Sequence, residues 1–179
     1  LLVALRDFDE VTVRTALQRF MAPNAVVHMC HPFGDLPAEE FYDTCFAPLY
    51  NAMPDLERRD TILVSGKTLE GNDWIGCCGS YIGTFAASFL DIPPTGHVAH
   101  MRFHEFYHIE DGQIVEVQAI WDIPELMMQA GAWPMAPSLG REWHTPSPIP
   151  QDGLLDATDQ TERAQFCQTH VLKMLTALV

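Results

Sequence analysis

Apolar residues follow a helical period near the start of the chain. Between residues 9 and 21 they recur every three or four positions, which predicts an amphipathic helix. Asp7 and Glu10 have the spacing of a capping box at its start. The apolar positions of this predicted helix are Val13, Ala16, Leu17, Phe20 and Met21.

A second helix is expected to begin at Pro37, because proline is favoured at the first helical position, and Asp35 precedes it. It should end by Met53 and Pro54, since the residue before a proline disfavours the helical conformation. The predicted inner face of this helix carries Phe41, Cys45 and Leu49.

After Pro54 the period of the pattern changes to two, as in strands. Glycines at 76, 79 and 83 inside one run predict bulges or bends that curve a sheet. Residues 92–96 form a proline-containing loop. Two helices followed by a strand meander are typical of an α+β fold. The predicted strands cover 61–64, 74–85, 98–109 and 113–122.

The C-terminal part of the chain lacks the strand pattern of residues 61–122. Five prolines between 134 and 150 predict an extended linker, and a helix is expected over about 159–178, with Asp159 and Glu162 as its capping box. We therefore divide the chain into a domain at 1–136, a linker at 137–152 and an amphipathic helical segment at 153–179. The apolar stripe of that helix is Ala164, Cys167, Val171, Met174, Leu175 and Leu178.

Composition narrows the classes of partner. Apolar residues make up 47% of the 179, enough for a full hydrophobic core. Ten basic residues against 24 acidic ones give a net charge of −14, which argues against nucleic acid or an anionic membrane surface as a partner.

The cysteines and the hydropathy pattern point to a cytoplasmic protein. Five cysteines without paired spacing predict free thiols in a reducing compartment, not a zinc site or a disulfide framework. No apolar run approaches the ~18–20 residues of a membrane span. The chain starts without methionine, so a fragment of a longer protein is one expectation.

Asp111 and Gly112 give the strongest hairpin signal, and two registers compete. A two-residue turn pairs Glu110 with Gln113, whereas a three-residue turn with a bulge at Gly112 pairs Ile109 with Gln113. We favour the bulged turn because it separates apolar from polar residues better. It places Phe103, Glu105, Tyr107, Val115, Val117, Ala119 and Trp121 on an inner face, and it places Arg102, His104, Phe106, His108, Ile114, Glu116, Gln118, Ile120 and Asp122 on an outer face.

Glu105 is the one acidic residue on that apolar face. Burial makes a carboxylate costly to ionise, so a raised pKa and a role as general acid or base are expected. The alternative is a glutamate that is bonded to buried donors and has only a structural role.

Histidines and aromatic residues supply further candidates. His100, His104 and His108 are four apart on a strand, about 13 Å per step, too far to share a metal ion. His28 and His31 are candidates for polar groups in the pocket, and the alternative for His28 is a core position. Trp74 and Tyr81 could line the pocket or simply belong to the core. The motifs of serine hydrolases, phosphate-binding loops and dinucleotide-binding folds are absent.

Six motifs in order carry a family resemblance over residues ~8–136. They are Pro54–Arg59, Gly79–Phe85, Ile92–Gly96, Arg102–Phe106, Asp111–Glu116 and Asp122–Gly131. Together they resemble the SnoaL-like polyketide (ester) cyclases of the nuclear-transport-factor-2-like superfamily. The resemblance implies a curved antiparallel sheet wrapped on N-terminal helices into a cone with an internal pocket, in a homodimer. It also implies that the last helix begins a second similar domain, and the alternative is an extension swapped onto a partner.

The resemblance also implies a chemistry. These cyclases close a polyketide ring by an aldol step without metal or cofactor, using an aspartate after the hairpin turn and a histidine on the preceding strand. The aspartate position falls on Ala119 and the histidine position on Glu105, opposed across the hairpin. The family's acid/base pair is therefore not carried over intact.

Two functions follow as expectations. The first is cofactor-independent acid/base chemistry on a hydrophobic carbonyl or ester compound, with Glu105, Tyr107 and His31 as catalytic residues. The second is a non-catalytic ligand-binding or regulatory domain, favoured by Ala119. A third class, an interaction module, would use Phe106, Ile114 and Ile120 on the outer face. The expected pocket lining is His28, Trp74, Tyr81, Phe103, Val117, Ala119 and Trp121.

Overall fold

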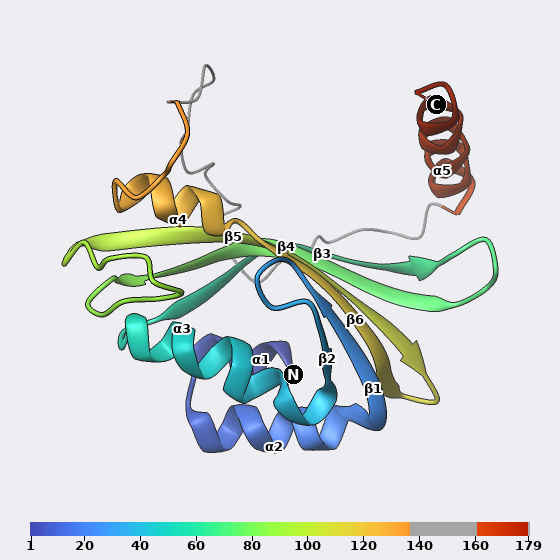
Figure 1. Cartoon of the computed structure of the whole chain (residues 1–179). Coiled ribbons are helices and arrows are strands. Elements are labelled where there is room, and N and C mark those ends of the chain that lie inside the picture. The colour runs from blue at the N-terminus through green and yellow to red at the C-terminus, as the bar shows by residue number, and fades with distance from the viewer. Residues whose placement is uncertain (137–160, 179) are drawn as a thin grey trace.

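One strongly curved sheet organises the chain in the computed structural model, which describes residues 1–136 and 161–178. Its six strands lie in the order β2-β1-β6-β5-β4-β3 (Figure 1). The helices are α1 (Leu2–Asp7), α2 (Glu10–Phe20), the 3₁₀ helix η1 (Ala38–Glu40), the π-helix η2 (Tyr42–Phe46), α3 (Ala47–Ala52), α4 (Ile123–Gln129) and α5 (Thr161–Thr176). The strands are β1 (Met21–Met29), β2 (Asp35–Pro37), β3 (Glu57–Lys67), β4 (Asp73–Thr84), β5 (Val98–Glu110) and β6 (Gln113–Trp121).

The sheet has an inner and an outer face. Helices α1, α2 and α3 lie against the inner, concave face, and α4 lies on the other side (Figure 1). β1 pairs with β6 in parallel, and each of the other neighbouring pairs is antiparallel. The core fills the space between the helices and the inner face with aromatic rings; for example, the ring centroids of Phe46 and Trp121 are 5.6 Å apart and those of Tyr81 and Phe103 are 4.8 Å apart.

Both predicted N-terminal helices are present, with changed details. The N-cap of α2 is Asp9, whose carboxylate accepts a hydrogen bond from the Thr12 amide at 2.8 Å, so the predicted capping box of Asp7 and Glu10 is wrong. The second predicted helix is a succession of η1, η2 and α3 that ends before Met53. Its predicted inner face is confirmed, because Phe41, Cys45 and Leu49 are all buried.

The predicted strands are confirmed, and the structure adds β1 and β2. Strand β3 extends well beyond the predicted 61–64, and β1 starts directly where α2 ends. Pro23 and Asn24 obscure β1 in the sequence, but every second residue after them is buried: Ala25, Val27 and Met29. That period of two was the signal from which β1 could have been predicted.

The hairpin uses the two-residue turn, so the predicted bulged turn is wrong. Glu110 pairs with Gln113, and both Asp111 (φ 49°) and Gly112 (φ 79°) lie in the left-handed region, as a type I′ turn requires. The register then shifts, because Ile109 pairs with Ile114 and His108 with Glu116. Val115 is left out of the pairing, and this bulge brings the later residues back to the predicted faces.

Two residues near the bulge therefore change their place. Ile114, predicted on the outer face, is buried, and Val115 is only half-buried. Farther from the turn the predicted faces are confirmed. Glu105 stands opposite Ala119, and Phe103, Tyr107, Val117 and Trp121 are buried on the inner face.

The structure describes only part of the C-terminal segment, so it tests little of the predicted domain division. The linker at 137–152 and the predicted cap residue Asp159 lie outside the described residues. Helix α5 covers Thr161–Thr176, close to its predicted extent, and none of its described residues is buried. Its assignment to a second domain or to a swapped extension stays a prediction.

Candidate functional site

A group of buried polar side chains lies at the centre of the inner face, and we call it the Glu105 cluster. The Glu105 carboxylate accepts hydrogen bonds from Arg58 Nη1 at 2.9 Å and from Trp121 Nε1 at 3.0 Å. The hydroxyls of Tyr81 and Tyr107 donate to it at 2.8 and 2.6 Å. Its members come from four adjacent strands and are Arg58, Asp60, Tyr81, Glu105, Tyr107 and Trp121.

The charges in this cluster are paired from the centre toward the surface. Arg58 Nε donates to Asp60 at 2.9 Å, so the guanidinium lies between two buried carboxylates, and it also lies 3.9 Å over the Phe103 ring. Arg6 of α1 reaches Asp60 at 3.3 Å from a partly exposed position. Two cations therefore face two carboxylates, and such pairing is what makes buried charges tolerable.

The electrostatics of Glu105 are the reverse of the sequence-based expectation. Burial alone would raise its pKa, but the Arg58 guanidinium and the donors of Tyr107, Trp121 and Tyr81 outweigh burial, and the pKa lies below the usual value. Burial, together with the Glu105 charge, raises the pKa of Tyr107 well above its ordinary value. The expected raised pKa of Glu105 is thus wrong, because its donors stabilise the ionised form.

This arrangement makes Glu105 a poor base. A general base works best when its pKa lies near the working pH and when it can reach a substrate proton. Four donors already occupy the Glu105 carboxylate, which is fully buried. The opposing Ala119 has no group that could exchange a proton.

The structure brings some of the predicted site residues together and separates others. Buried on the inner face are Glu105, Tyr107, Tyr81, Phe103, Val117, Ala119 and Trp121. His31 is exposed in the turn after β1. His28 is half-buried beside Gln118, with Nδ1 2.7 Å from Asp35, and the Trp74 ring stacks on His108 at 5.0 Å. His28 and Trp74 therefore lie outside the cluster.

Sequence reasoning missed Arg58 and Asp60. A buried carboxylate needs a cationic partner, which was the available signal for a cation near Glu105. Selecting Arg58 required knowing that β3 pairs with β4 and that Arg58 lies beside Tyr81 in that register.

A small apolar cavity opens next to the cluster, near the hairpin turn. This hairpin cavity has a volume of about 260 Å³. Tyr107 contributes to its wall, while the Tyr107 hydroxyl donates to Glu105, so one side chain connects the cavity to the buried cluster. The cavity is lined by Leu1, Leu2, Phe20, Ile75, Tyr107, Ile109, Gly112 and Ile114.

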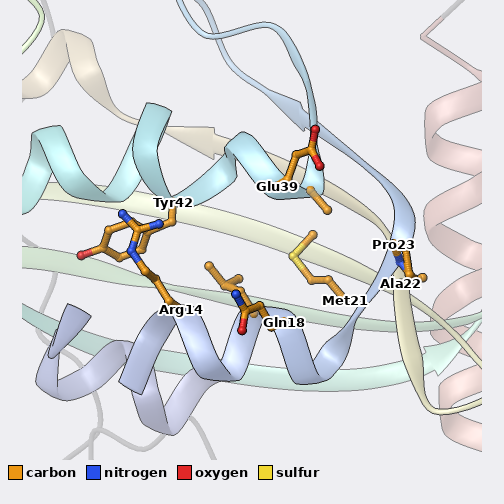
Figure 2. Close-up of a pocket in the computed structure, with 9 residues that line it drawn as sticks. Arg14, Gln18, Met21, Ala22, Pro23, Glu39 and Tyr42 are labelled. Atoms are coloured by element: carbon orange, nitrogen blue, oxygen red, sulfur yellow. The ribbon is translucent and has the colours of Figure 1, made fainter. Parts of the chain in front are cut away.

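A second cavity lies between α2, the start of β1 and the η1–η2 segment (Figure 2). This helix cavity has a volume of about 310 Å³. Its floor is apolar, and Arg14, Gln18 and Glu39 stand at its edge. It is lined by Arg14, Leu17, Gln18, Met21, Ala22, Pro23, Ala38, Glu39 and Tyr42.

Thiol groups and metal ligands add no further site in the described part of the chain. All five cysteines are free, as predicted, and burial raises the pKa of the Cys45 thiol to about 12. Between 1–136 and 161–178 no three His, Cys, Asp or Glu side chains are grouped to hold a metal ion. None of the helices described is both long enough and apolar enough to span a membrane.

Solved structures with this fold share little sequence with the chain. IdmH of Streptomyces antibioticus, a candidate polyketide cyclase, is 24% identical with a TM-score of 0.58, covering 72% of this chain and 91% of its own. AclR of Streptomyces galilaeus, a candidate hydroxylase, is 17% identical with a TM-score of 0.61 over 76% and 80% of the two chains. A SnoaL-like polyketide cyclase of Agrobacterium tumefaciens is 23% identical with a TM-score of 0.50 over 65% and 84%. At these identities the likeness shows the fold alone.

The family is shown by sequence. No curated protein matches the chain. The family model described as SnoaL-like polyketide cyclase matches residues 3–130. The α+β fold, with a curved, unclosed sheet and N-terminal helices, agrees with the fold expected from the resemblance. The chain therefore belongs to the SnoaL-like polyketide cyclase family.

Proposed function

We propose that this domain binds a small, mostly apolar organic molecule in the hairpin cavity and does not perform the family's ring closure there. The observation that carries the proposal is the cavity itself. Its wall is almost entirely hydrocarbon, and it includes Tyr107, whose hydroxyl donates to Glu105 of the buried cluster. Apolar walls with a few placed polar groups are typical of small-molecule sites.

The size of the cavity limits the ligand. At about 260 Å³ it lies just below the ~300–1,000 Å³ common for drug-sized ligands, so a compact molecule of one or two rings fits better than a larger fused system.

Absence of ring-closing chemistry is supported by the two positions where the family holds its acid/base pair. Ala119 cannot exchange a proton, and Glu105 is kept ionised and occupied by four donors. A ligand in the hairpin cavity would meet Tyr107 before Glu105, and burial keeps the Tyr107 hydroxyl protonated.

Binding can be tested with 2-naphthol, a two-ring phenol, followed by its fluorescence and by calorimetry. Ile109→Trp fills the cavity and is expected to weaken binding about ten-fold or more, equivalent to ~1.4 kcal/mol. Ile120→Trp, an isoleucine of the same hairpin exposed on the outer face, is the matched control and should bind as the wild type does. Equal binding by both variants would place the ligand elsewhere and overturn the proposal.

A second candidate function is acid/base chemistry through Tyr107, because its hydroxyl lies 2.6 Å from Glu105 and its side chain lines the cavity. Mass spectrometry of the bound compound after incubation separates the two functions. Turnover that is lost in Tyr107→Phe would favour chemistry; a compound recovered unchanged would favour binding.

A further inference from the structure

The helix cavity has an apolar floor that is part of the core. Leu17, Met21, Ala22 and Tyr42 are each less than 10% exposed, yet they line an open space of about 310 Å³. In Figure 2, Met21 lies in the middle of this space, with Gln18 on α2 on one side and Glu39 on η1 on the other. The space can hold a compact hydrocarbon body.

The polar groups at the edge of the cavity carry an excess of negative charge. Arg14 is already paired, because its Nε lies 2.8 Å from Glu10 and its other nitrogens contact Asp43. Its guanidinium also lies 4.1 Å over the Tyr42 ring, which holds it against the cavity wall. The lining carboxylate of Glu39 and the two carboxylates that contact Arg14, those of Glu10 and Asp43, outnumber the one guanidinium and leave a net charge of −2.

Two groups at this edge are available to a ligand. Within residues 1–136 and 161–178 the side chains of Gln18 and Glu39 have neither a hydrogen-bond nor an ion-pair partner. Both are exposed, so their side chains can rotate over the opening within nanoseconds. Glu39 offers a carboxylate to a cation, and Gln18 offers an amide oxygen from the opposite side.

We propose that the helix cavity binds a small organic cation, an amine carried on a compact apolar body. The body would fill the space over Met21 and Leu17, and the ammonium group would lie between Glu39 and Gln18. An anion of the same shape meets carboxylates at the edge, and the one nearby guanidinium is already occupied by two of them. This site is separate from the hairpin cavity and does not depend on the function proposed for that cavity.

The expected selectivity can be measured with two molecules of nearly equal shape and opposite charge. Phenethylamine and 3-phenylpropionate each carry one ring on a short chain, and ligand-observed NMR titrations at low salt would compare them. Phenethylamine should bind more tightly, and Glu39→Gln should weaken its binding about two- to five-fold, the range of an exposed ion pair. Glu40→Gln, which removes the neighbouring exposed carboxylate outside the cavity lining, should have a smaller effect.

A second pair of variants tests the place of the ring. Ala38→Phe inserts a ring into the cavity and is expected to abolish binding, whereas Ala87→Phe on an exposed loop should leave it unchanged. Ile109→Trp in the hairpin cavity should also leave phenethylamine binding unchanged. Equal affinity for the anion and the amine, or full binding by Ala38→Phe, would overturn the proposal.

Discussion

The Glu105 carboxylate accepts four hydrogen bonds, which leaves it little freedom to exchange a proton with a substrate. The carboxylate has a cation on one side and two phenol hydroxyls and an indole N–H around it, all within 3.0 Å. The same contacts that make it a poor base make it a structural centre that ties four strands together. Removing one partner of a buried pair leaves the other charge uncompensated.

We therefore expect Glu105→Gln to lower the free energy of unfolding by about 3–5 kcal/mol near neutral pH, because buried Arg58 must then share the one carboxylate of Asp60 with Arg6. Denaturant unfolding would measure the loss. Glu110→Gln at the exposed end of the same strand is the control, with a change near zero. In the double variant with Arg58→Met, the total loss should be smaller than the sum of the single losses, since the Arg58–Glu105 pair is then lost only once and Asp60 keeps Arg6 at 3.3 Å.

The same variant has a pH signature with a defined sign. The pKa of Glu105 in the folded protein is below its ordinary 4.5, so its contribution to stability is present above pH 4.5 and is lost as the pH falls through the folded value. The difference in unfolding free energy between wild type and Glu105→Gln should shrink as the pH is lowered below about 4.5. A difference that stays constant over this range would show that the carboxylate charge is not what stabilises the fold.

At the scale of elements, the pairing of β3 with β4 leaves no room for a side chain at Gly79. A Cβ at Gly79 would lie 2.0 Å from the Arg59 carbonyl oxygen and 2.8 Å from the Phe103 ring. The β3 register shifts just there, between Asp60 and Ile62. Gly79 pairs with Asp60 in β3, so a side chain at this position would displace the strand that carries Arg58 and Asp60 of the Glu105 cluster.

Gly79→Ala should consequently destabilise the fold by about 3 kcal/mol or more, because backbone has to move to make room. Gly76→Ala in the same strand is the matched comparison: its Cβ would meet the side chain of Phe106 at 3.0 Å, and that ring is 44% exposed and can turn away. Thermal unfolding of the two variants side by side gives the measurement. A larger loss at position 76 would mean that the approach of β3 is not rigid.

At the scale of the whole molecule, the outer face of the sheet carries exposed apolar side chains. Ile62 and Ile120 lie in one cross-strand row and Val64 and Phe106 in the next, and each is at least 40% exposed. We propose that a second copy of the chain covers this surface in the homodimer that the resemblance implies. A two-fold dimer would use the same patch on both copies, since such interfaces are self-complementary.

Phe106→Lys should shift the protein toward a monomer in light scattering after size exclusion, because it places a charge in the centre of that patch. Val98→Lys, on an exposed apolar residue at the far end of the same strand, is the control. A wild-type protein that is monomeric at high concentration would exclude this interface.

The sequence by itself determined the faces of the long strands and the face of each N-terminal helix, because apolar residues at periods of two and 3.6 have one consistent way to be buried. It also determined the family, through six motifs in order, and it singled out Glu105 as the charged residue of an apolar face. The turn at Asp111 and Gly112 was located, but its register was not, since a two-residue turn followed by a bulge at Val115 gives the later residues the same faces as the predicted three-residue turn.

Only the tertiary structure decided what Glu105 does. Its pKa depends on Arg58, 47 residues away in the sequence, and on hydroxyls from β4 and β5 that strand pairing brings within 3.0 Å. Periodicity predicts that a side chain is buried, whereas the charge state of a buried group depends on which donors surround it. Strand pairing also decided which side chains belong to the cluster. His28 and Trp74, candidates by residue type, lie outside it, while Arg58 and Asp60 are part of it.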